Sequence, residues 1–124
     1  MNADNFALPA LIRKLRSEII WKPQATSRHL LKRKLRGHLP PQASISDYES
    51  IIKSILGLQE ASIYVYYAGD ATYLSIAGWL DNRLWLVIAS LDGVLETAFV
   101  VENSETYLDR AAFEYVGKIS EVVK

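Results

Sequence analysis

The segment from Thr26 to Pro41, TSRHLLKRKLRGHLPP, contains both histidines of the chain and five of its arginines and lysines. Histidine exchanges a proton near neutral pH, and arginine and lysine side chains bind phosphate oxygens. RNA cleavage without a metal ion needs such groups: a base for the 2′-hydroxyl proton, cations for the phosphate, and an acid for the leaving oxygen. A solvated helix face, or one that only binds nucleic acid, has the same spacing.

Helical geometry places His29 among the cations of this segment. At about 100° per residue, Lys32, Arg33 and Arg36 lie within about 60° of His29 on a helix. Nearby positive charge disfavours the imidazolium ion, so we expect the pKa of His29 to lie below its usual value of about 6.5. A neutral His29 can act as a base.

Leu31 and Leu35 fall on the opposite side of the same helix. The apolar stripe of a surface helix normally faces the core. We therefore expect these two leucines to anchor the helix to the sheet, with the basic face turned outward.

Three helices are predicted in the first half of the chain. The first runs from about Pro9 to Ile20 and carries an apolar stripe at helical spacing. The second begins after Thr26 or Ser27 and is ended by Gly37 and the prolines that follow. The third follows an S-x-x-E capping box at residues 46–49 and ends before residue 57.

The pattern changes at about residue 61 to four runs rich in β-branched and aromatic residues, SIYVYYA, TYLSIAGWL, LWLVIASL and VLETAFVV. Such runs, joined by connectors of a few residues, predict four strands in an antiparallel meander. A last helix is expected from about residue 104. The predicted fold class is α+β, with N-terminal helices packed on a four-stranded antiparallel sheet and a C-terminal helix.

We divide the 124 residues into two parts. Residues 1–22 are interpreted as an N-terminal amphipathic helix extension that docks on the domain, on a second copy or in a partner's groove. Residues 23–124 are long enough for a single α+β domain with one core.

Charge is unevenly distributed in a chain whose net charge is zero. Residues 1–42 hold nine basic and two acidic residues, a balance of +7, which leaves −7 for the remainder. This asymmetry suggests a polyanion partner such as RNA, or contact between the two parts, within one chain or in a homo-oligomer. The basic residues are Arg13, Lys14, Arg16, Lys22, Arg28, Lys32, Arg33, Lys34 and Arg36.

The composition also bounds cofactors and location. The chain has no cysteine, which excludes disulfides and thiolate metal sites, and its carboxylates are scattered over turns and helix starts. We expect no metal and no cofactor. No apolar run approaches the roughly 20 residues of a membrane span, and the N-terminus lacks the pattern of a secretory signal, so the predicted location is the cytoplasm.

The order of several short motifs resembles the barnase, EndoU, colicin and RelE-like (BECR) nuclease superfamily, in particular its phage-associated and polymorphic-toxin branches. The motifs are R-H-x-x-K-R in a helix, Asp47-Tyr48 at the start of an I-I-x-x-I-L helix, a central W-L-V-I strand, D-G-x-x-x-T-A-F, and a final Y-L helix. They extend from about Trp21 to Ile119. The resemblance implies helices on a four-stranded antiparallel sheet and cleavage of tRNA or translated mRNA without a metal.

By position, the resemblance makes His29, Arg33 and Thr97 the catalytic residues, with His29 as base and the Thr97 hydroxyl on the scissile phosphate. The general acid stays open between His38, Tyr73 and Tyr107. The residues expected to bind substrate are Arg28, Lys32, Arg36, His38 and Tyr73.

Two functions are compatible with these residues. The first is an endoribonuclease, perhaps a toxin with a cognate antitoxin or immunity protein. The alternative is a noncatalytic module that only binds RNA or protein, such as an antitoxin or an immunity protein.

Overall fold

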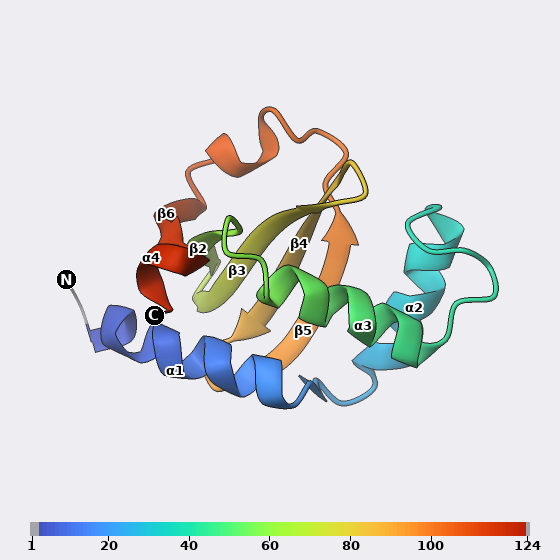
Figure 1. Ribbon diagram of the computed structural model, residues 1–124, viewed down its shortest axis with the longest axis horizontal. Coiled ribbons are helices and arrows are strands. Elements are labelled where there is room, and N and C mark those ends of the chain that lie inside the picture. The colour runs from blue at the N-terminus through green and yellow to red at the C-terminus, as the bar shows by residue number, and fades with distance from the viewer. Residues whose placement is uncertain (1–2, 124) are drawn as a thin grey trace.

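The computed structural model describes residues 3–123 of the chain (Figure 1). In chain order its elements are α1 (Ala3–Ser17), β1 (Ile20–Trp21), α2 (Ala25–Leu35), α3 (Ile45–Leu56), β2 (Ser62–Ala68), β3 (Ala71–Leu80), β4 (Arg83–Ser90), β5 (Val94–Val100), a 3₁₀ turn (Tyr107–Asp109), β6 (Phe113–Lys118) and α4 (Ile119–Val122).

The strands of the described residues form one mixed sheet in the order β1-β5-β4-β3-β2-β6. Strands β2 to β5 pair antiparallel with their chain neighbours, as the sequence predicts. The sheet is extended at both edges, because β1 runs parallel to β5 and β6 runs antiparallel to β2. The α+β class is confirmed, whereas the sheet is six-stranded and mixed instead of four-stranded and antiparallel.

The predicted helix from about residue 104 is wrong. That stretch holds the 3₁₀ turn and strand β6, and the helix α4 after it has four residues. Leu108, Ala112 and Val116 have helical spacing only by coincidence, since FEYVGK is rich in residues that favour strands. As a strand, β6 pairs the edge of β2 and satisfies the backbone groups of that edge.

Helix α3 begins two residues earlier than predicted, because its N-cap is Ser44 instead of Ser46. The Ser44 hydroxyl accepts a hydrogen bond from the Asp47 N–H at 3.1 Å, and the Asp47 carboxylate accepts one from the Ser44 N–H at 2.9 Å. This reciprocal pair has the geometry of a capping box. Glu49, predicted to belong to the box, instead accepts a hydrogen bond from the indole N–H of Trp21 at 2.7 Å.

Helix α2 also begins earlier than predicted. It follows Gln24, which has a φ of 65°, and no side chain caps its start. Thr26 and Ser27 therefore lie inside the helix. The predicted end is confirmed, because Gly37 follows the C-cap with a φ of 74°, a left-handed conformation that glycine adopts without strain.

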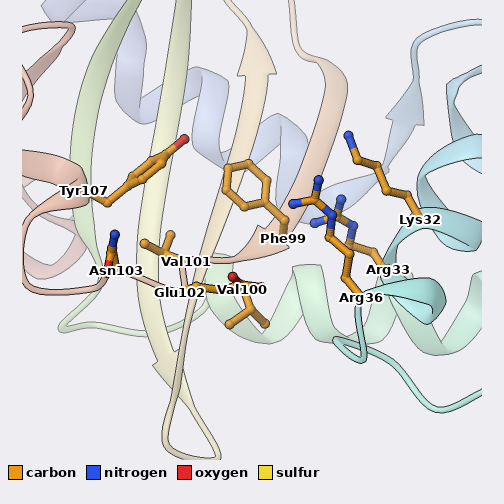
Figure 2. Close-up of a pocket in the computed structure, with 9 residues that line it drawn as sticks. All are labelled: Lys32, Arg33, Arg36, Phe99, Val100, Val101, Glu102, Asn103 and Tyr107. Atoms are coloured by element: carbon orange, nitrogen blue, oxygen red, sulfur yellow. The ribbon is translucent and has the colours of Figure 1, made fainter.

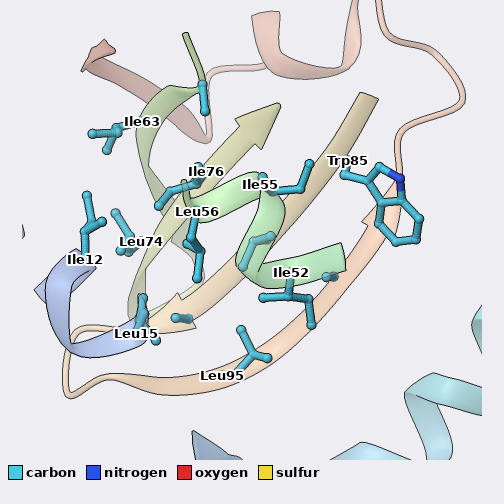
Figure 3. Close-up of a cluster of buried hydrophobic side chains, with 14 of the residues drawn as sticks. Ile12, Leu15, Ile52, Ile55, Leu56, Ile63, Leu74, Ile76, Trp85 and Leu95 are labelled. Atoms are coloured by element: carbon cyan, nitrogen blue, oxygen red, sulfur yellow. The ribbon is translucent and has the colours of Figure 1, made fainter. Parts of the chain in front are cut away.

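The main core lies between α1, α3 and one face of the sheet (Figure 3). Ile12 and Leu15 of α1 meet Ile52 of α3 and Leu74 and Ile76 of β3, and all five side chains are at most 1% exposed. Burial of such side chains is the main source of stability in a domain of this size.

Helix α1 shares this core with the rest of the chain. It spans residues 3–17, not 9–20, and Pro9 lies inside it. Because its side chains pack against α3 and the sheet, the boundary drawn at residue 22 does not separate two packing units. No helix among residues 3–123 is long and apolar enough to cross a membrane.

The opposite face of the sheet carries a second, smaller cluster. The segment from 101 to 113, drawn in orange in Figure 1, passes over this face. The buried members of this second cluster are Ala77, Leu84, Leu86, Ile88, Val101 and Phe113.

We predict that truncation of one α1 leucine will destabilise the whole domain. Leu15→Ala removes a side chain that is 1% exposed, so unfolding should become easier by about 2 to 5 kcal/mol. Leu35→Ala is the matched control, since Leu35 is 77% exposed, and we expect a change of at most about 0.5 kcal/mol. Urea unfolding of both variants gives the measurement. Equal stability of wild type and Leu15→Ala contradicts a core role for α1.

Candidate functional site

Helix α2 lies along the edge of β5. Strand β1 pairs only with the first residues of β5, Ile20 with Val94 and Trp21 with Leu95. Beyond them the edge is lined by α2 (Figure 1), whose first residue, Ala25, is fully buried. The orientation of α2 therefore decides which side chains meet the sheet.

The structure turns α2 the opposite way from the prediction. Leu31 and Leu35 do not anchor the helix, because they are 58% and 77% exposed, whereas Arg33 is 3% exposed. The main core is already filled by α1 and α3, and α2 meets the strand at its edge, where backbone groups need polar partners. Of the cations in this segment, Arg33 therefore faces the protein, whereas Arg28, Lys32 and Arg36 are exposed.

Arg33 is held by neutral groups. Its Nη1 lies 3.1 Å from Nδ1 of His38, and its guanidinium carbon lies 5.5 Å from the centre of the Phe99 ring, in a cation–π contact. Its buried Nε has no hydrogen-bond partner, and within residues 3–123 no carboxylate forms an ion pair with it. Burial lowers the pKa of Arg33, but arginine stays charged in proteins. A buried positive charge is thus left without a negative partner.

His38 has a structural role, in contrast to the prediction that it binds substrate. It is 4% exposed, and its Nδ1 accepts hydrogen bonds from the Val100 N–H at 3.2 Å and from Arg33. With Nδ1 as the acceptor, the proton of a neutral ring is on Nε2, which lies 3.6 Å from the Glu102 carboxylate. Burial, and then the charge of Arg33, lower the pKa of His38. A neutral His38 therefore ties α2 to β5.

His29 and Thr97, predicted as catalytic partners, lie together. His29 Nδ1 is 3.2 Å from the Thr97 Oγ1, between α2 and β5. A bulge helps to place Thr97: Ile88 pairs with Thr97 and Ala89 with Leu95, so that Glu96 is the extra residue of β5. Bulges of this kind redirect side chains and are frequent beside active sites.

Tyr48 supports this pair from the core, a role that its sequence position does not reveal. Its fully buried hydroxyl donates to the Ala98 carbonyl and accepts from the Ala98 N–H at 3.1 Å. Burial raises the pKa of Tyr48, opposed by hydrogen bonds with Ala98 and Thr97. Tyr48, bonded to the backbone of the residue after Thr97, thus lies behind the contact between Thr97 and His29.

The pKa of His29 is lowered, as predicted, although not mainly for the predicted reason. Burial is the largest cause, followed by the charges of Arg28, Arg33 and Lys32, while Glu96 acts in the opposite direction. The net effect keeps the imidazole neutral at pH 7 and leaves one ring nitrogen with a free lone pair.

A cleft of about 350 Å³ opens beside these residues (Figure 2). Figure 2 shows Lys32, Arg33 and Arg36 of α2 on one side, Tyr107 and Asn103 on the other, and Phe99 between them. The segment 99–103 forms its floor. Lys32 and Arg36 therefore line a concave site, as expected for substrate-binding residues.

Of the other predicted residues, Arg28 and Tyr73 do not line this cleft. Arg28 is exposed on α2, and its positive charge helps to lower the pKa of His29. Tyr73 lies on β3, where it pairs with Ser90, and its ring centre is 6.1 Å from that of Tyr66. It does not line the cleft, so its predicted substrate contact has no support in the geometry. Tyr107 does line the cleft.

No cluster of three or more histidine, aspartate or glutamate side chains that could hold a metal occurs among residues 3–123. Comparison of the chain with known protein families, with curated proteins and with solved structures finds no match.

We predict that both histidines titrate below 6.5 in the folded protein. Each then binds fewer protons when folded than when unfolded at mildly acidic pH. Their contribution to stability should be complete above about pH 6.5 and should be lost as the pH falls toward the folded pKa values. NMR titration of the ring protons of His29 and His38 gives the pKa values directly, and urea unfolding between pH 7.5 and 5.5 gives the slope. A pKa above 6.5 for either ring contradicts the geometry described for it.

Proposed function

We propose that this protein is a metal-independent endoribonuclease of the BECR type that cleaves tRNA or mRNA. The observation that carries the proposal is the contact between His29 of α2 and Thr97 of β5. Lys32, Arg33 and Arg36 line the cleft from the same side. A neutral imidazole, fixed by a hydroxyl and surrounded by cations, suits the removal of a proton from a ribose beside a phosphate.

In this mechanism Thr97 positions the base. If the His29 Nδ1–H donates to the Thr97 Oγ1, the lone pair of the ring lies on Nε2, on the side away from β5. The hydrogen bonds of the Tyr48 hydroxyl with the backbone of Ala98 hold β5 in place beside the threonine. Thr97 then acts through His29, instead of contacting the phosphate as the resemblance implies.

The reaction is an internal transfer. His29 Nε2 takes the proton of the ribose 2′-hydroxyl, and the 2′-oxygen attacks the adjacent phosphorus. The bond from phosphorus to the 5′-oxygen of the next nucleotide breaks, and that oxygen takes up a proton. The products are a 2′,3′-cyclic phosphate and a 5′-hydroxyl, and no outside oxidant or nucleophile is consumed.

The cations and the acid come from the cleft. Lys32 and Arg36 line it and supply the positive charge that the dianionic transition state needs. Of the three candidate acids, His38 is buried with its Nδ1 occupied, Tyr73 lies away from the cleft, and Tyr107 lines it. We assign Tyr107 as the proton donor to the leaving 5′-oxygen.

A noncatalytic module that binds a protein partner is the second candidate, on one specific observation. Leu31 and Leu35, one helical turn apart, are exposed on a helix that carries four basic residues and no acidic one. An acidic partner protein with an apolar groove would cover this surface. If this protein is a toxin, the partner would be its antitoxin or immunity protein. If this protein is itself an antitoxin, the partner would be its toxin.

We predict that His29→Ala loses cleavage while it keeps RNA binding. The cations remain, but removal of a general base should slow cleavage by about 100- to 10,000-fold. Because base, cations and acid are all side chains, the wild-type rate should persist in excess chelator. The measurement is single-turnover cleavage of tRNA and mRNA, with filter binding in parallel and Leu31→Ala as a control on the same helix. Intact RNA after long incubation with wild type, or a His29→Ala variant as fast as its parent, rejects the endoribonuclease.

Thr97 offers a matched pair of variants. Thr97→Ser keeps the hydroxyl, whereas Thr97→Val replaces it by a methyl group of similar size. We expect Thr97→Val to lower the cleavage rate at least tenfold and to change the His29 pKa, and Thr97→Ser to stay within about threefold of wild type. Cleavage rates across pH 5 to 8 make the comparison. If the two variants behave alike, Thr97 does not position the base.

A further inference from the structure

The cleft beside α2 has the size of a site for one nucleotide. Its volume of about 350 Å³ falls at the lower end of the range for small-molecule sites, roughly 300 to 1,000 Å³. It lies one helical turn, about 5.4 Å, beyond His29 along α2. A strand of RNA cleaved at His29 would therefore bring a neighbouring nucleotide to the cleft.

The buried charge of Arg33 calls for an anion or a strong hydrogen-bond acceptor in this cleft. Arg33 lines the cleft, is 97% buried, and has an Nε without a partner. An unpaired buried donor destabilises the folded protein, and more so when it is charged. A phosphate oxygen or a base carbonyl bound between Arg33, Lys32 and Arg36 relieves that destabilisation.

Aromatic rings line the cleft beside these cations. Phe99 and Tyr107 have ring centres 6.1 Å apart at 78°, and both line the cleft. The Arg110 guanidinium carbon lies 4.6 Å from the centre of the Tyr107 ring and stiffens it from outside the cleft. Aromatic and guanidinium planes of this kind stack unpaired bases. A base inside a duplex cannot enter such a site without leaving its stack.

Two polar side chains of the cleft can recognise the edge of a base: Asn103, on the side opposite the cations, and Glu102, whose carboxylate lies 3.6 Å from Nε2 of His38. The Glu102 side chain is 74% exposed, and Glu102 and Asn103 both line the cleft. A carboxylate only accepts hydrogen bonds, so it favours a base that offers an N–H donor there. The exocyclic amino groups of cytosine and adenine are such donors, whereas uracil and guanine have a carbonyl at the equivalent position.

We propose that the cleft is a subsite for one unpaired base of the RNA, stacked on Tyr107 and read at Glu102 through its exocyclic amino group. The proposal rests on the proposed action on RNA and adds a substrate class: single-stranded RNA with cytosine or adenine, rather than uracil or guanine, beside the cut. The phosphate of the same nucleotide lies against Lys32 and Arg36.

Cytidine and uridine 3′-monophosphate test this subsite, because the two differ only at the base edge in question. Their affinities are measured by NMR titration of the intact protein and require no cleavage. We expect wild type to bind the cytidine nucleotide about tenfold tighter, and Glu102→Gln, whose amide both donates and accepts, to bind the two alike. Tyr107→Leu should weaken both by about 5- to 100-fold.

Matched variants separate a local effect from unfolding. Tyr115→Leu changes a tyrosine that is 54% exposed and does not line the cleft, and it should leave both affinities unchanged. If Tyr107→Leu lowers the unfolding temperature strongly, Asn103→Ala serves instead, since Asn103 is exposed, and a loss of nucleotide affinity is again expected. A variant that folds as wild type does and keeps both affinities overturns the stacked position.

Failure of the subsite and failure of the proposed function give different results. A cytidine preference that needs Glu102, in a protein that cuts no RNA, supports the subsite and rejects the endoribonuclease. Equal affinity of wild type for the two nucleotides, or a preference that survives Glu102→Gln, rejects the subsite. The latter outcome leaves a His29-dependent cleavage activity, measured separately, unaffected.

Discussion

The position of α2 depends on one buried cation. Arg33 reaches from the helix toward β5, where it meets His38 and Phe99, and His38 in turn accepts the N–H of Val100. These polar contacts take the place that an apolar stripe would occupy in a helix packed on a core. Because they fix the rotation of α2, they also set His29 against Thr97, one turn back along the same helix.

The same constraint explains the charge of the site. Arg33 is too buried to be hydrated and has only neutral partners in the described part of the chain, so the surrounding field is strongly positive. Burial, and then the charges of Arg28, Arg33 and Lys32, lower the pKa of His29, which a base requires, and the same charges attract a phosphate, which a substrate supplies. In our proposal, the unpaired charge of Arg33, which destabilises the free protein, attracts the phosphates of the RNA. Functional sites commonly keep this kind of unsatisfied group.

The sequence allowed the local elements to be predicted where pattern and local chemistry agree. The strand runs and their short connectors predicted β2 to β5, and Gly37 predicted the end of α2. A resemblance named both His29 and Thr97 as catalytic residues, with Thr97 on the phosphate, and the structure places the two side chains in contact.

The remaining errors come from tertiary structure. The edge strand β1 has only two residues, and β6 reads as a helix because Leu108, Ala112 and Val116 happen to be spaced by four. The rotation of α2 could not be predicted from amphipathicity, since the core that would receive Leu31 and Leu35 is filled by α1 and α3. Arg33 and His38 are buried against each other, and a contact of this kind cannot be predicted from the local sequence pattern.

The central claim, that His29 activates a 2′-hydroxyl, is tested most directly by an RNA with one altered sugar. The strongest cut in a tRNA or mRNA is first located with wild-type protein in excess chelator, and the 2′-hydroxyl at that position alone is then replaced by hydrogen. Our account predicts that the altered RNA binds with unchanged affinity and is not cut there, while the unaltered RNA leaves a 2′,3′-cyclic phosphate. Cleavage at the position that lacks the 2′-hydroxyl contradicts the account.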